Sequence, residues 1–472
     1  MAQSSTTTGS ASSTLRKTLI PLALAQFICS FAGSNMNVMI TDISRDLNTT
    51  VQGVQIAITA FLLVMAALMI PGGKLTDRYG RKWCFNLGLG LYGVGAVLSA
   101  ASPGLGVLIL GNSIFEGVGT ALLIPPVYIL ATLLFTETTS RARAFGAISA
   151  AGGLGAASGP LIGGAIATGI SWRAAFVFQA LIIVLIVLLS RRNVTDPRPA
   201  DPTRSFDVFG AVLSAVGLAM LVLGIMAAEN NLWLMIGLMG GGALVLAWFF
   251  LTARRKEHAG EEPLLSPSLF RNRISNLGLV TQNAQWLMLM GMSFTVAAYL
   301  QVVRGYNAVE TGLIFSAATV GLLLTSLGAE RFAKRFSQRM LISVGFMLTI
   351  GGVAVLLLMV TGRPSVWAFT PGLLLIGLGV GVMLTPSVNV VQSAFGEEQQ
   401  GEISGLSRSV SNLGSSMGTA IAGTILVAGI TTSPGASYTF AMVALAAIGL
   451  IGLSAALLLP HARSPRQAQQ AA

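Results

Sequence analysis

The chain has 472 residues, of which 53% are hydrophobic and only 10% are charged, and its mean hydropathy is +0.76. A soluble globular domain carries about 25% charged residues, so the composition excludes a soluble protein, a disordered chain and a disulfide-rich secreted scaffold. The net charge of +11 comes from basic residues in short loops between apolar runs, which is typical of a protein that crosses a membrane many times and binds no nucleic acid.

Fourteen apolar runs follow one another, and each is long enough for a membrane-spanning helix of about 20 residues. Their approximate boundaries are 18–40, 53–73, 84–103, 106–134, 143–168, 174–190, 208–228, 232–252, 275–301, 309–329, 340–361, 366–392, 405–429 and 438–459. The first run resembles a signal peptide near Arg16, but it continues to Ile40, which favours an uncleaved span. Strand-like alternation is absent, so the prediction is an all-α polytopic membrane protein.

The basic residues test this count, because cytoplasmic loops of membrane proteins are rich in Lys and Arg. An even number of spans places both termini on one side. If that side is the cytoplasm, 24 of the 28 Lys and Arg residues lie in cytoplasmic segments, and the other four are Arg45, Arg173, Arg304 and Arg363. A span more or fewer would destroy this asymmetry, so we expect fourteen spans with both termini cytoplasmic.

Two long links, rich in Pro and charged residues, divide the spans into groups of six, two and six. A basic loop follows the second span of each six-span group, and two similar halves are typical of transporters. The predicted organisation is a disordered cytoplasmic tail (1–17), an N-terminal six-helix bundle (18–190), a linker with two extra helices (191–274), a C-terminal six-helix bundle (275–459) and a cytoplasmic tail (460–472).

Two motifs carry a resemblance to a known family. The loop after the second span reads Gly73-x-Leu75-x-Asp77-Arg78-x-Gly80-Arg81-Lys82, and the fifth span contains Gly155, Gly159, Pro160, Gly163 and Gly164. The loop resembles the signature of the major facilitator superfamily, and the fifth span resembles the antiporter motif of its drug exporters. With fourteen spans and Phe206-Asp207-x-x-Gly210 opening the seventh, the chain is similar to the fourteen-helix drug:proton antiporter family. The resemblance implies a major facilitator fold.

The loop motif is predicted to form a cytoplasmic gate. A carboxylate at a helix end can cap a neighbouring helix, and an Arg can pair across helices, so such bonds would break when two halves of a transporter rock. The alternative is a turn whose charges only determine topology. The predicted gate residues are Gly73, Asp77, Arg78, Gly80 and Arg81, with Glu137 as a candidate partner of Arg81.

The fifth-span motif is predicted to pack closely, because glycines allow helices to approach and a proline kinks the helix. One interpretation is a proton-impermeable contact on the outer side that bends during transport. The other is ordinary packing of small residues. The residues concerned are Gly155, Gly159, Pro160, Gly163 and Gly164.

Glu116 is the one acidic residue near the middle of a span. A charge there costs about 2.5–3.5 kcal/mol on insertion scales, and such residues usually face a cavity or a proton path. Since burial favours the neutral carboxyl, Glu116 could take up and release protons, and it is the predicted proton-coupling residue. The alternative is a permanently protonated side chain bonded to a neighbouring helix.

The chain departs from the family pattern where carboxylates usually lie. Ala32 stands where the first span often has Asp, and the thirteenth span has no acid inside its apolar stretch. The fourth span has Ser113 and Glu116 where the family normally has Arg and Gln. These departures put export of dications in doubt and leave the charge of the substrate open.

Polar residues on the first, ninth and thirteenth spans are predicted to line a central cavity, since the corresponding helices face the cavity in this superfamily. Polar side chains also join helices inside membranes, so a structural role is an equal alternative. The predicted cavity residues are Gln26, Asn35, Asn37, Gln282, Asn283, Trp286, Arg408 and Asn412.

The predicted function is proton-coupled export of amphipathic small molecules or drugs by alternating access in the bacterial cytoplasmic membrane. The first alternative is an exporter or flippase of a lipid-like or dedicated metabolite, and the second is a non-transporting membrane sensor or scaffold. The expected partners are a small amphipathic substrate, protons and the lipid bilayer, and we expect a monomer that is not an enzyme. The proton gradient would supply the energy, so no cofactor or metal is expected.

Overall fold

The computed structural model describes residues 6–135, 138–194, 196, 205–228, 231–360, 365–396, 399–429 and 432–460. In these ranges every regular element is a helix. Fourteen helical segments of the described chain are long and apolar enough to cross a membrane, which confirms the predicted number of spans.

The helices follow the order of the predicted spans. The first six spans comprise α1 (Thr6–Asn35) with η1 (Met36–Met39) and α2 (Ile40–Asp46), α3 (Val51–Tyr79), α4 (Arg81–Ala100), α5 (Leu105–Leu108) with η2 (Ile109–Glu116) and α6 (Gly117–Leu134), α7 (Thr138–Gly169) and α8 (Trp172–Asn193). The next two are α9 (Val208–Ala227) and α10 (Leu232–His258). The last six are α11 (Arg273–Ala298) with η4 (Tyr299–Val303), α12 (Ala308–Arg335), α13 (Gln338–Val360), α14 (Thr370–Gln392), α15 (Gln400–Gly429) and α16 (Pro434–Leu457), and η3 (Pro267–Arg271) and η5 (Val366–Ala368) lie in connections.

Short polar turns determine where several helices start. The Thr50 hydroxyl accepts a hydrogen bond from the Gly53 N–H at 3.1 Å and caps α3. Asn307 and Glu310 form a capping box at the start of α12, each accepting a backbone N–H of the other. Gly80 has a φ of 96°, which L side chains rarely adopt, and this turn ends α3 and lets α4 begin at the next residue.

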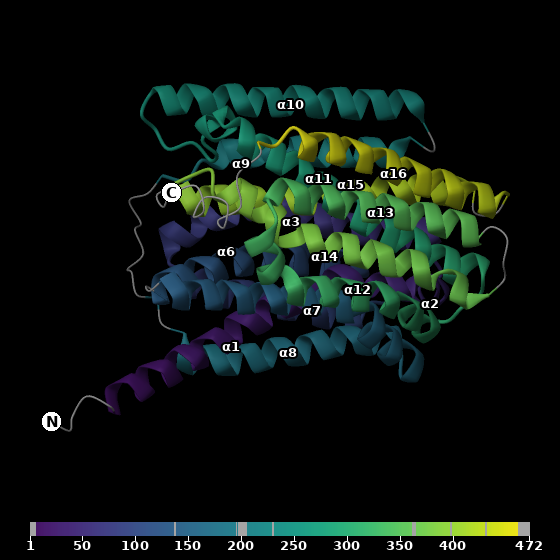
Figure 1. Cartoon of the computed structure of the whole chain (residues 1–472), viewed down its shortest axis with the longest axis horizontal. Helices are drawn as coiled ribbons and strands as arrows, with labels where there is room; N and C mark the ends of the chain where they lie inside the picture. The colour runs from purple at the N-terminus through teal and green to yellow at the C-terminus, as the bar shows by residue number, and fades with distance from the viewer. Residues whose placement is uncertain are drawn as a thin grey trace.

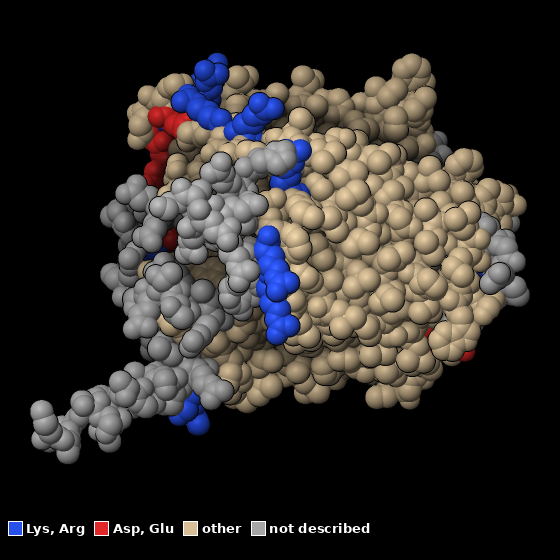
Figure 2. All heavy atoms as spheres, in the orientation of Figure 1, with Lys and Arg blue, Asp and Glu red and all other residues tan. Residues whose placement is uncertain are grey.

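The helices run along one long axis, and α1 begins at the same end of the bundle at which α16 finishes (Figure 1, left). We call this the terminal end and the opposite one the far end. Figure 2 shows Lys and Arg gathered toward the terminal end, while the broad face beside it is almost uncharged. A wide apolar face of this kind is what contact with lipid tails requires.

The twelve spans outside α9 and α10 pack as two halves that meet along two seams. In the first half α1 packs on α7, and α4 packs on α6 and α8. In the second half α11 packs on α15 and α16, and α14 packs on α12 and α13. The halves touch where α3 lies against α15 and where α7 lies against α12. Any passage through the protein must therefore run between these two seams.

The two additional spans lie at the periphery. α9 packs against α3 and α15 together, and so covers one of the two seams from outside. α10 packs mainly on α9 and is the outermost helix in Figure 1. Its side chains Trp233 and Leu244 are 81% and 73% exposed, which places this helix almost entirely in contact with the surroundings of the protein.

The beginning of the chain differs from the expectation for residues 1–17. These were predicted to be disordered, but α1 already includes residues 6–17. Adding residues to an existing helix needs no new nucleation, so a Ser/Thr/Ala-rich segment can continue the helix that the first apolar run establishes.

Candidate functional site

The glycines of the span-five motif lie on two faces of α7. Gly155, Gly159 and Gly163 face α1 in the same half, where Cβ atoms added to them would crowd or overlap the atoms of α1. Small residues at these three positions therefore allow α1 and α7 to pack with their backbones close together.

The remaining motif residues, Gly164 and Pro160, face the other half. A Cβ added at Gly164 would overlap the carbonyl oxygen of Ala308 on α12. A Cβ added at Gly312, one turn further along α12, would overlap the carbonyl oxygen of Pro160 in the same way. The two halves are thus in backbone contact at the far end of the α7–α12 seam.

Hydrogen bonds extend this seam in both directions. The backbone N–H of Val309 donates to the Thr168 hydroxyl at 3.0 Å near the far end. Deeper in the bundle, the Thr319 hydroxyl donates to the carbonyl of Ala157 at 2.9 Å. Along this line α12 is held to α7 by few bonds and by direct backbone packing.

Serine hydroxyls connect the halves along the other seam. On α15, Ser416 donates to the carbonyl of Thr59 at 3.0 Å, and Ser409 donates to the carbonyl of Ala66 at 2.6 Å, both on α3. Each hydroxyl donates to a backbone carbonyl oxygen that has a second lone pair for the hydrogen bond within α3. These bonds between the halves can therefore form or break without leaving the α3 backbone unpaired.

Asn37, a predicted cavity residue, also bridges the halves. Its side-chain amide donates to the Ser293 hydroxyl at 3.1 Å, and its carbonyl accepts from the Gln301 side chain at 2.8 Å. The Gln301 side-chain oxygen in turn accepts from the backbone N–H of Thr41 at 3.2 Å. These contacts close the far end between the first and ninth spans.

Nearer the terminal end, a chain of polar contacts crosses between the halves. Arg408 of α15 donates a hydrogen bond to the Tyr128 hydroxyl on α6, and its guanidinium carbon lies 4.7 Å from the ring centroid. The Tyr128 hydroxyl lies 3.3 Å from the side-chain oxygen of Gln26 on α1, and Gln26 donates to Ser30 at 3.1 Å. Two predicted cavity residues, Gln26 and Arg408, are thereby joined through a tyrosine that the sequence did not single out.

The other predicted cavity residues have different surroundings. Gln282 accepts from the Ser407 hydroxyl at 2.8 Å, and Asn283 donates to a carbonyl of α15 at 3.0 Å, so both join α11 to α15 within one half. The buried Asn35 amide has no hydrogen-bond partner in the described part of the chain. Trp286 and Asn412 are partly exposed.

A small cavity of about 70 Å³ lies where α7, α11, α12 and α14 meet. Most of its lining is apolar, with Met290, Met292, Phe315 and Leu322 among the larger side chains. Drug-sized ligands need roughly 300 Å³ or more, so the halves must separate before such a molecule can bind here.

Glu116 lies inside the first half, away from both seams. It ends the π-helical segment η2, is fully buried and accepts a hydrogen bond from the Ser99 hydroxyl of α4 at 3.3 Å. Its second carboxyl oxygen has no partner among the described residues. Gly95 on α4 makes room for it, since a Cβ at that position would come within 2.8 Å of the Glu116 Cγ.

The loop between α3 and α4 is held by two acidic side chains. Asp77, at the end of α3, pairs with Arg81, at the start of α4, at 3.0 Å across the Gly80 turn. Asp196, beyond the sixth span, accepts from the backbone N–H of Arg81 at 2.7 Å and of Lys82 at 3.3 Å, and so caps α4.

The other predicted gate residues surround this pair. The Arg78 guanidinium lies 5.5 Å from the Tyr79 ring, and Gly73 packs against α6. Gly80 makes the turn described above. Glu137, the predicted partner of Arg81, lies outside the described residues.

A second carboxylate at the terminal end fastens the α9–α10 pair. Asp207 accepts from the Gly210 N–H and the Lys256 ammonium at 2.8 Å each, and from the Leu264 N–H at 3.3 Å. Burial alone would raise the pKa of Asp207, but these three donors outweigh it and lower the pKa below its ordinary value. On the same side, Glu402 of α15 accepts from the backbone N–H of Ser266 at 2.6 Å.

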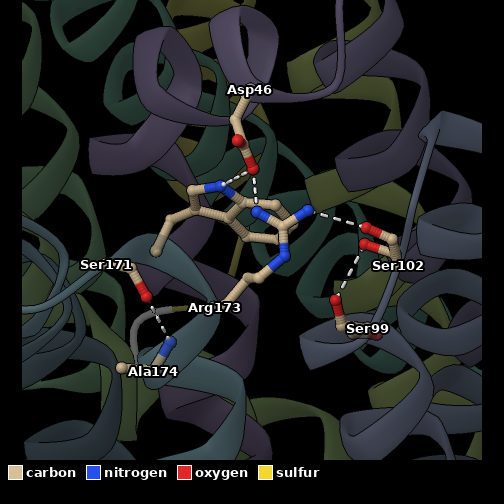
Figure 3. A network of polar contacts seen from close by, with 7 residues as sticks. Asp46, Ser99, Ser102, Ser171, Arg173 and Ala174 are labelled. Carbon is tan, nitrogen blue, oxygen red and sulfur yellow. Dashed lines mark hydrogen bonds and ion pairs between the residues drawn. The ribbon is translucent and has the colours of Figure 1, made fainter.

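At the far end, the Asp46 carboxylate binds side chains at the start of α8 (Figure 3). It pairs with Arg173 and accepts from the Trp172 indole N–H at 2.9 Å, while Arg173 also donates to the carbonyl of Ser102 at 2.8 Å. The cluster borders an open pocket of about 420 Å³. All these residues belong to the first half, so the cluster stabilises that half and does not join it to the other.

Several residues of the site had little sequence signal. Tyr128 stands in an apolar run with only its hydroxyl to distinguish it, and Ser409 and Ser416 belong to a serine-rich stretch whose helical face cannot be assigned without the partner helix. Asp196 and Asp207 were visible as acids in a connection, but the helix end that each one caps depends on the tertiary fold.

The model of the Major Facilitator Superfamily matches residues 22–229 and again residues 208–419. The chain is similar to the puromycin resistance protein pur8 of Streptomyces alboniger, with 30% identity over 86% of this chain and 81% of that protein. It is also similar to the cephamycin export protein CmcT of Amycolatopsis lactamdurans (27% identity, 96% and 93% covered) and the multidrug resistance protein Stp of Mycobacterium tuberculosis (26%, 87% and 76%). The solved peptide transporter POT in complex with sulfate shares the fold, with a TM-score of 0.68, 17% identity, and 93% and 94% of the two chains covered.

Proposed function

Because the chain belongs to the major facilitator superfamily, we propose that it is a proton-coupled exporter of amphipathic small molecules or drugs that works by alternating access. The names of the puromycin and multidrug resistance relatives support a drug as substrate. The name of the cephamycin export relative favours, as a second candidate, the export of one dedicated metabolite by the same mechanism.

The backbone contact between α7 and α12 carries this proposal. Alternating access needs a seal that excludes protons on one side of the substrate and yet separates once in each cycle. At Gly164 and Gly312 the seal consists of backbone atoms of the two halves in direct contact, which leaves no room for water between them. Only a few hydrogen bonds must break when it opens.

The orientation of the protein follows from its charges. The terminal end carries the basic loops, and loops of this kind face the cytoplasm. In this orientation the far end faces outward, and the protein has its outward side closed. We place it in the bacterial cytoplasmic membrane.

Glu116 is the proposed proton carrier. It is a fully buried carboxyl group inside a span, with one hydrogen-bonded oxygen and one oxygen that has no partner in the described chain. π-helical segments such as η2 are frequent at functional sites, because a shift of one residue converts them to α-helix. Such a shift would move the Glu116 carboxyl relative to Ser99 and expose it to protons.

The loop between α3 and α4 is the proposed cytoplasmic gate. Arg81 is bonded through its side chain to Asp77 and through its backbone to Asp196, so it connects the second, third and sixth spans at the terminal end. These three described contacts lie within the first half, so a gating role requires further contacts of this loop with the second half that form or break when the halves rock.

Dye efflux from proteoliposomes under an imposed pH gradient tests the proposal, with the full-length chain and its Glu116→Gln variant. We expect gradient-driven efflux of at least one of three amphipathic compounds that differ in charge (pyrenebutyric acid, pyrenebutanol and ethidium) by the wild type and its loss in the variant, which should retain gradient-independent exchange of substrate across the membrane. Glu261→Gln is the matched control, because it makes the same change at an exposed carboxylate in the connection that follows α10.

Two outcomes would contradict the proposal. Gradient-driven efflux by Glu116→Gln would assign a structural role to this side chain. Failure of the wild type to move any of these compounds would favour the dedicated-metabolite candidate.

A further inference from the structure

The space between the two halves contains one described charged side chain, and its charge is positive. Where the structure describes side chains, only Glu116 and Arg408 are charged residues well inside a span, and the others lie near span ends or in connections. Glu116 is directed toward Ser99 within the first half. Arg408, in contrast, extends from the second half to Tyr128 of the first.

Arg408 is held in the interior and has free binding capacity. It lies seven residues after Gly401, which starts its span, at a depth of about 10 Å for a helical rise of 1.5 Å per residue. A long basic side chain near a span end usually turns toward water, but this one stacks on the Tyr128 ring. It forms no ion pair with any described residue and is partly exposed, so most of its five N–H donors remain available.

The surroundings of this guanidinium suit a ligand with an apolar body. The Phe145 ring lies 5.7 Å from the Tyr128 ring, so the ring on which the guanidinium stacks is itself packed against a second aromatic side chain. On α7, Gly152 packs against the Gln26 side chain, and Ala156, one helical turn further, lines the apolar cavity. One turn of α7, about 6 Å, therefore separates the polar chain of Arg408, Tyr128 and Gln26 from the cavity.

Resting on the proposed export function, we propose that the substrate is an amphipathic anion. Its carboxylate, or another acidic oxygen group, binds the Arg408 guanidinium, which matches such groups with two parallel hydrogen bonds. Its apolar body occupies the space next to Ala156 and Phe315 once the halves separate. Cationic drugs are poor substrates, because no described carboxylate faces this space.

The charge of the substrate determines how transport responds to the membrane potential. Export of a monovalent anion in exchange for one inward proton transfers two positive charges inward, so an inside-negative potential drives the reaction. Exchange of a monovalent cation for one proton transfers no net charge. The two substrate classes therefore differ in a property that can be measured without any mutation.

Three pyrene compounds with the same ring system provide the probes: pyrenebutyric acid, pyrenebutanol and pyrenebutyl-trimethylammonium. Binding is measured with the full chain in nanodiscs without a gradient, and transport is measured in proteoliposomes with a potassium diffusion potential. We expect the wild type to bind the acid at least tenfold more tightly than the ammonium compound. An inside-negative potential should accelerate export of the acid.

Arg408→Gln should weaken binding of the acid by roughly ten- to a hundredfold and leave the alcohol unchanged, since one charge-assisted contact is lost. Arg408→Lys should lose part of this affinity, because an ammonium group cannot form the bidentate contact. Arg273→Gln, which removes an exposed charge at the start of α11, is the matched control and should behave as the wild type.

A wild type that prefers the ammonium compound, or an Arg408→Gln variant that weakens all three probes equally, would overturn the inference. If the Arg408→Gln variant does not fold, the wild type alone still tests the inference. Its preference among the three probes and the response of its transport to the membrane potential then show whether the substrate is an anion. Selective binding of the acid without gradient-driven transport would refute the proposed export function but support the anion site at Arg408. Gradient-driven transport of the ammonium compound alone would support the export function and refute the anion site.

Discussion

Gly164 of α7 and Ala308 of α12 are in backbone contact, so at the far end the two halves of the protein touch with no side chain between them. A methyl group at Gly164 must push α12 away from α7. We expect Gly164→Ala to lower gradient-driven transport at least tenfold and to increase proton leakage through the empty protein. Transport and the collapse of a pH gradient, both followed with dyes in proteoliposomes, measure the two effects.

Gly153 supplies the control for this substitution. It lies on the same helix, and a Cβ there would have its nearest neighbour, on Leu322, at an ordinary 4.0 Å. Gly153→Ala should therefore transport like the wild type. Equal activities of the two alanine variants would show that the backbone contact at Gly164 is not needed for the seal.

A covalent bond across the same seam should stop the cycle. Thr168 and Val309 are joined by a 3.0 Å hydrogen bond between a side chain of α7 and the backbone of α12. A disulfide between Thr168→Cys and Val309→Cys should hold the outward side closed, abolish transport and be reversed by dithiothreitol. The native Cys29 and Cys84 are both buried and free, so they offer little competition for the oxidant.

The single cysteine variants distinguish a lock from simple damage to the seam. Each should retain transport under oxidising conditions. Full activity of the cross-linked double variant would mean that α7 and α12 stay together throughout transport, and alternating access at this seam would be refuted.

Asp207 should make the protein more sensitive to acid. Its three donors lower its pKa below the ordinary value of 3.8, so the carboxylate stabilises the fold above 3.8, and the contribution is lost as the pH falls from there through the lowered pKa of the folded state. Asp207→Asn should remove about 2 kcal/mol near neutral pH, the typical contribution of hydrogen bonds to a charged group. It should also flatten the decline in melting temperature that the wild type shows as the pH falls below the ordinary value of 3.8.

Melting of the detergent-solubilised protein at a series of pH values provides the measurement. Glu261→Gln is the control, because Glu261 is an exposed acid in the connection that follows α10. If both variants show the same pH dependence as the wild type, the Asp207–Lys256 pair adds nothing to stability.

The cluster around Asp46 should contribute modestly to stability. The Asp46 and Arg173 side chains are 46% and 33% exposed, and pairs in contact with water contribute about 1 kcal/mol or less. Asp46→Asn should lower the melting temperature slightly, and the difference from wild type should shrink in 1 M salt. Asp42→Asn, beside the same pocket, should have no such effect. A salt-independent loss would point to the Trp172 hydrogen bond as the main contribution.

Much of the fold was predictable because the bilayer imposes simple rules. The lengths of the apolar runs and the distribution of Lys and Arg gave fourteen spans, and the structure has fourteen such helices in its described part. At the N-terminus, where Ser/Thr-rich composition predicts a disordered tail, α1 starts at Thr6. Helix extension from a stable span outweighs the local preference of Ser and Thr there.

Side-chain roles were harder to derive than spans. Gly164 and Gly155 belong to one motif, but only their angular positions on α7 determine that one faces the other half and one faces α1. Gln26 and Arg408 were identified as polar residues inside spans, yet their link depends on Tyr128, from a third helix. A contact between three helices that are distant in sequence does not change the residue periodicity of any one of them, so the sequence pattern does not reveal it.

The position of α9 has a consequence for molecules dissolved in the lipid. Because α9 lies across α3 and α15 together, it blocks the lateral route from the bilayer into the space between the halves on that side. Among the described helices, none packs on α7 and α12 together in the way that α9 packs on α3 and α15. A hydrophobic compound that enters from the bilayer must therefore approach on the side of α7 and α12, so the two extra spans leave only one of the two seams open to lipid.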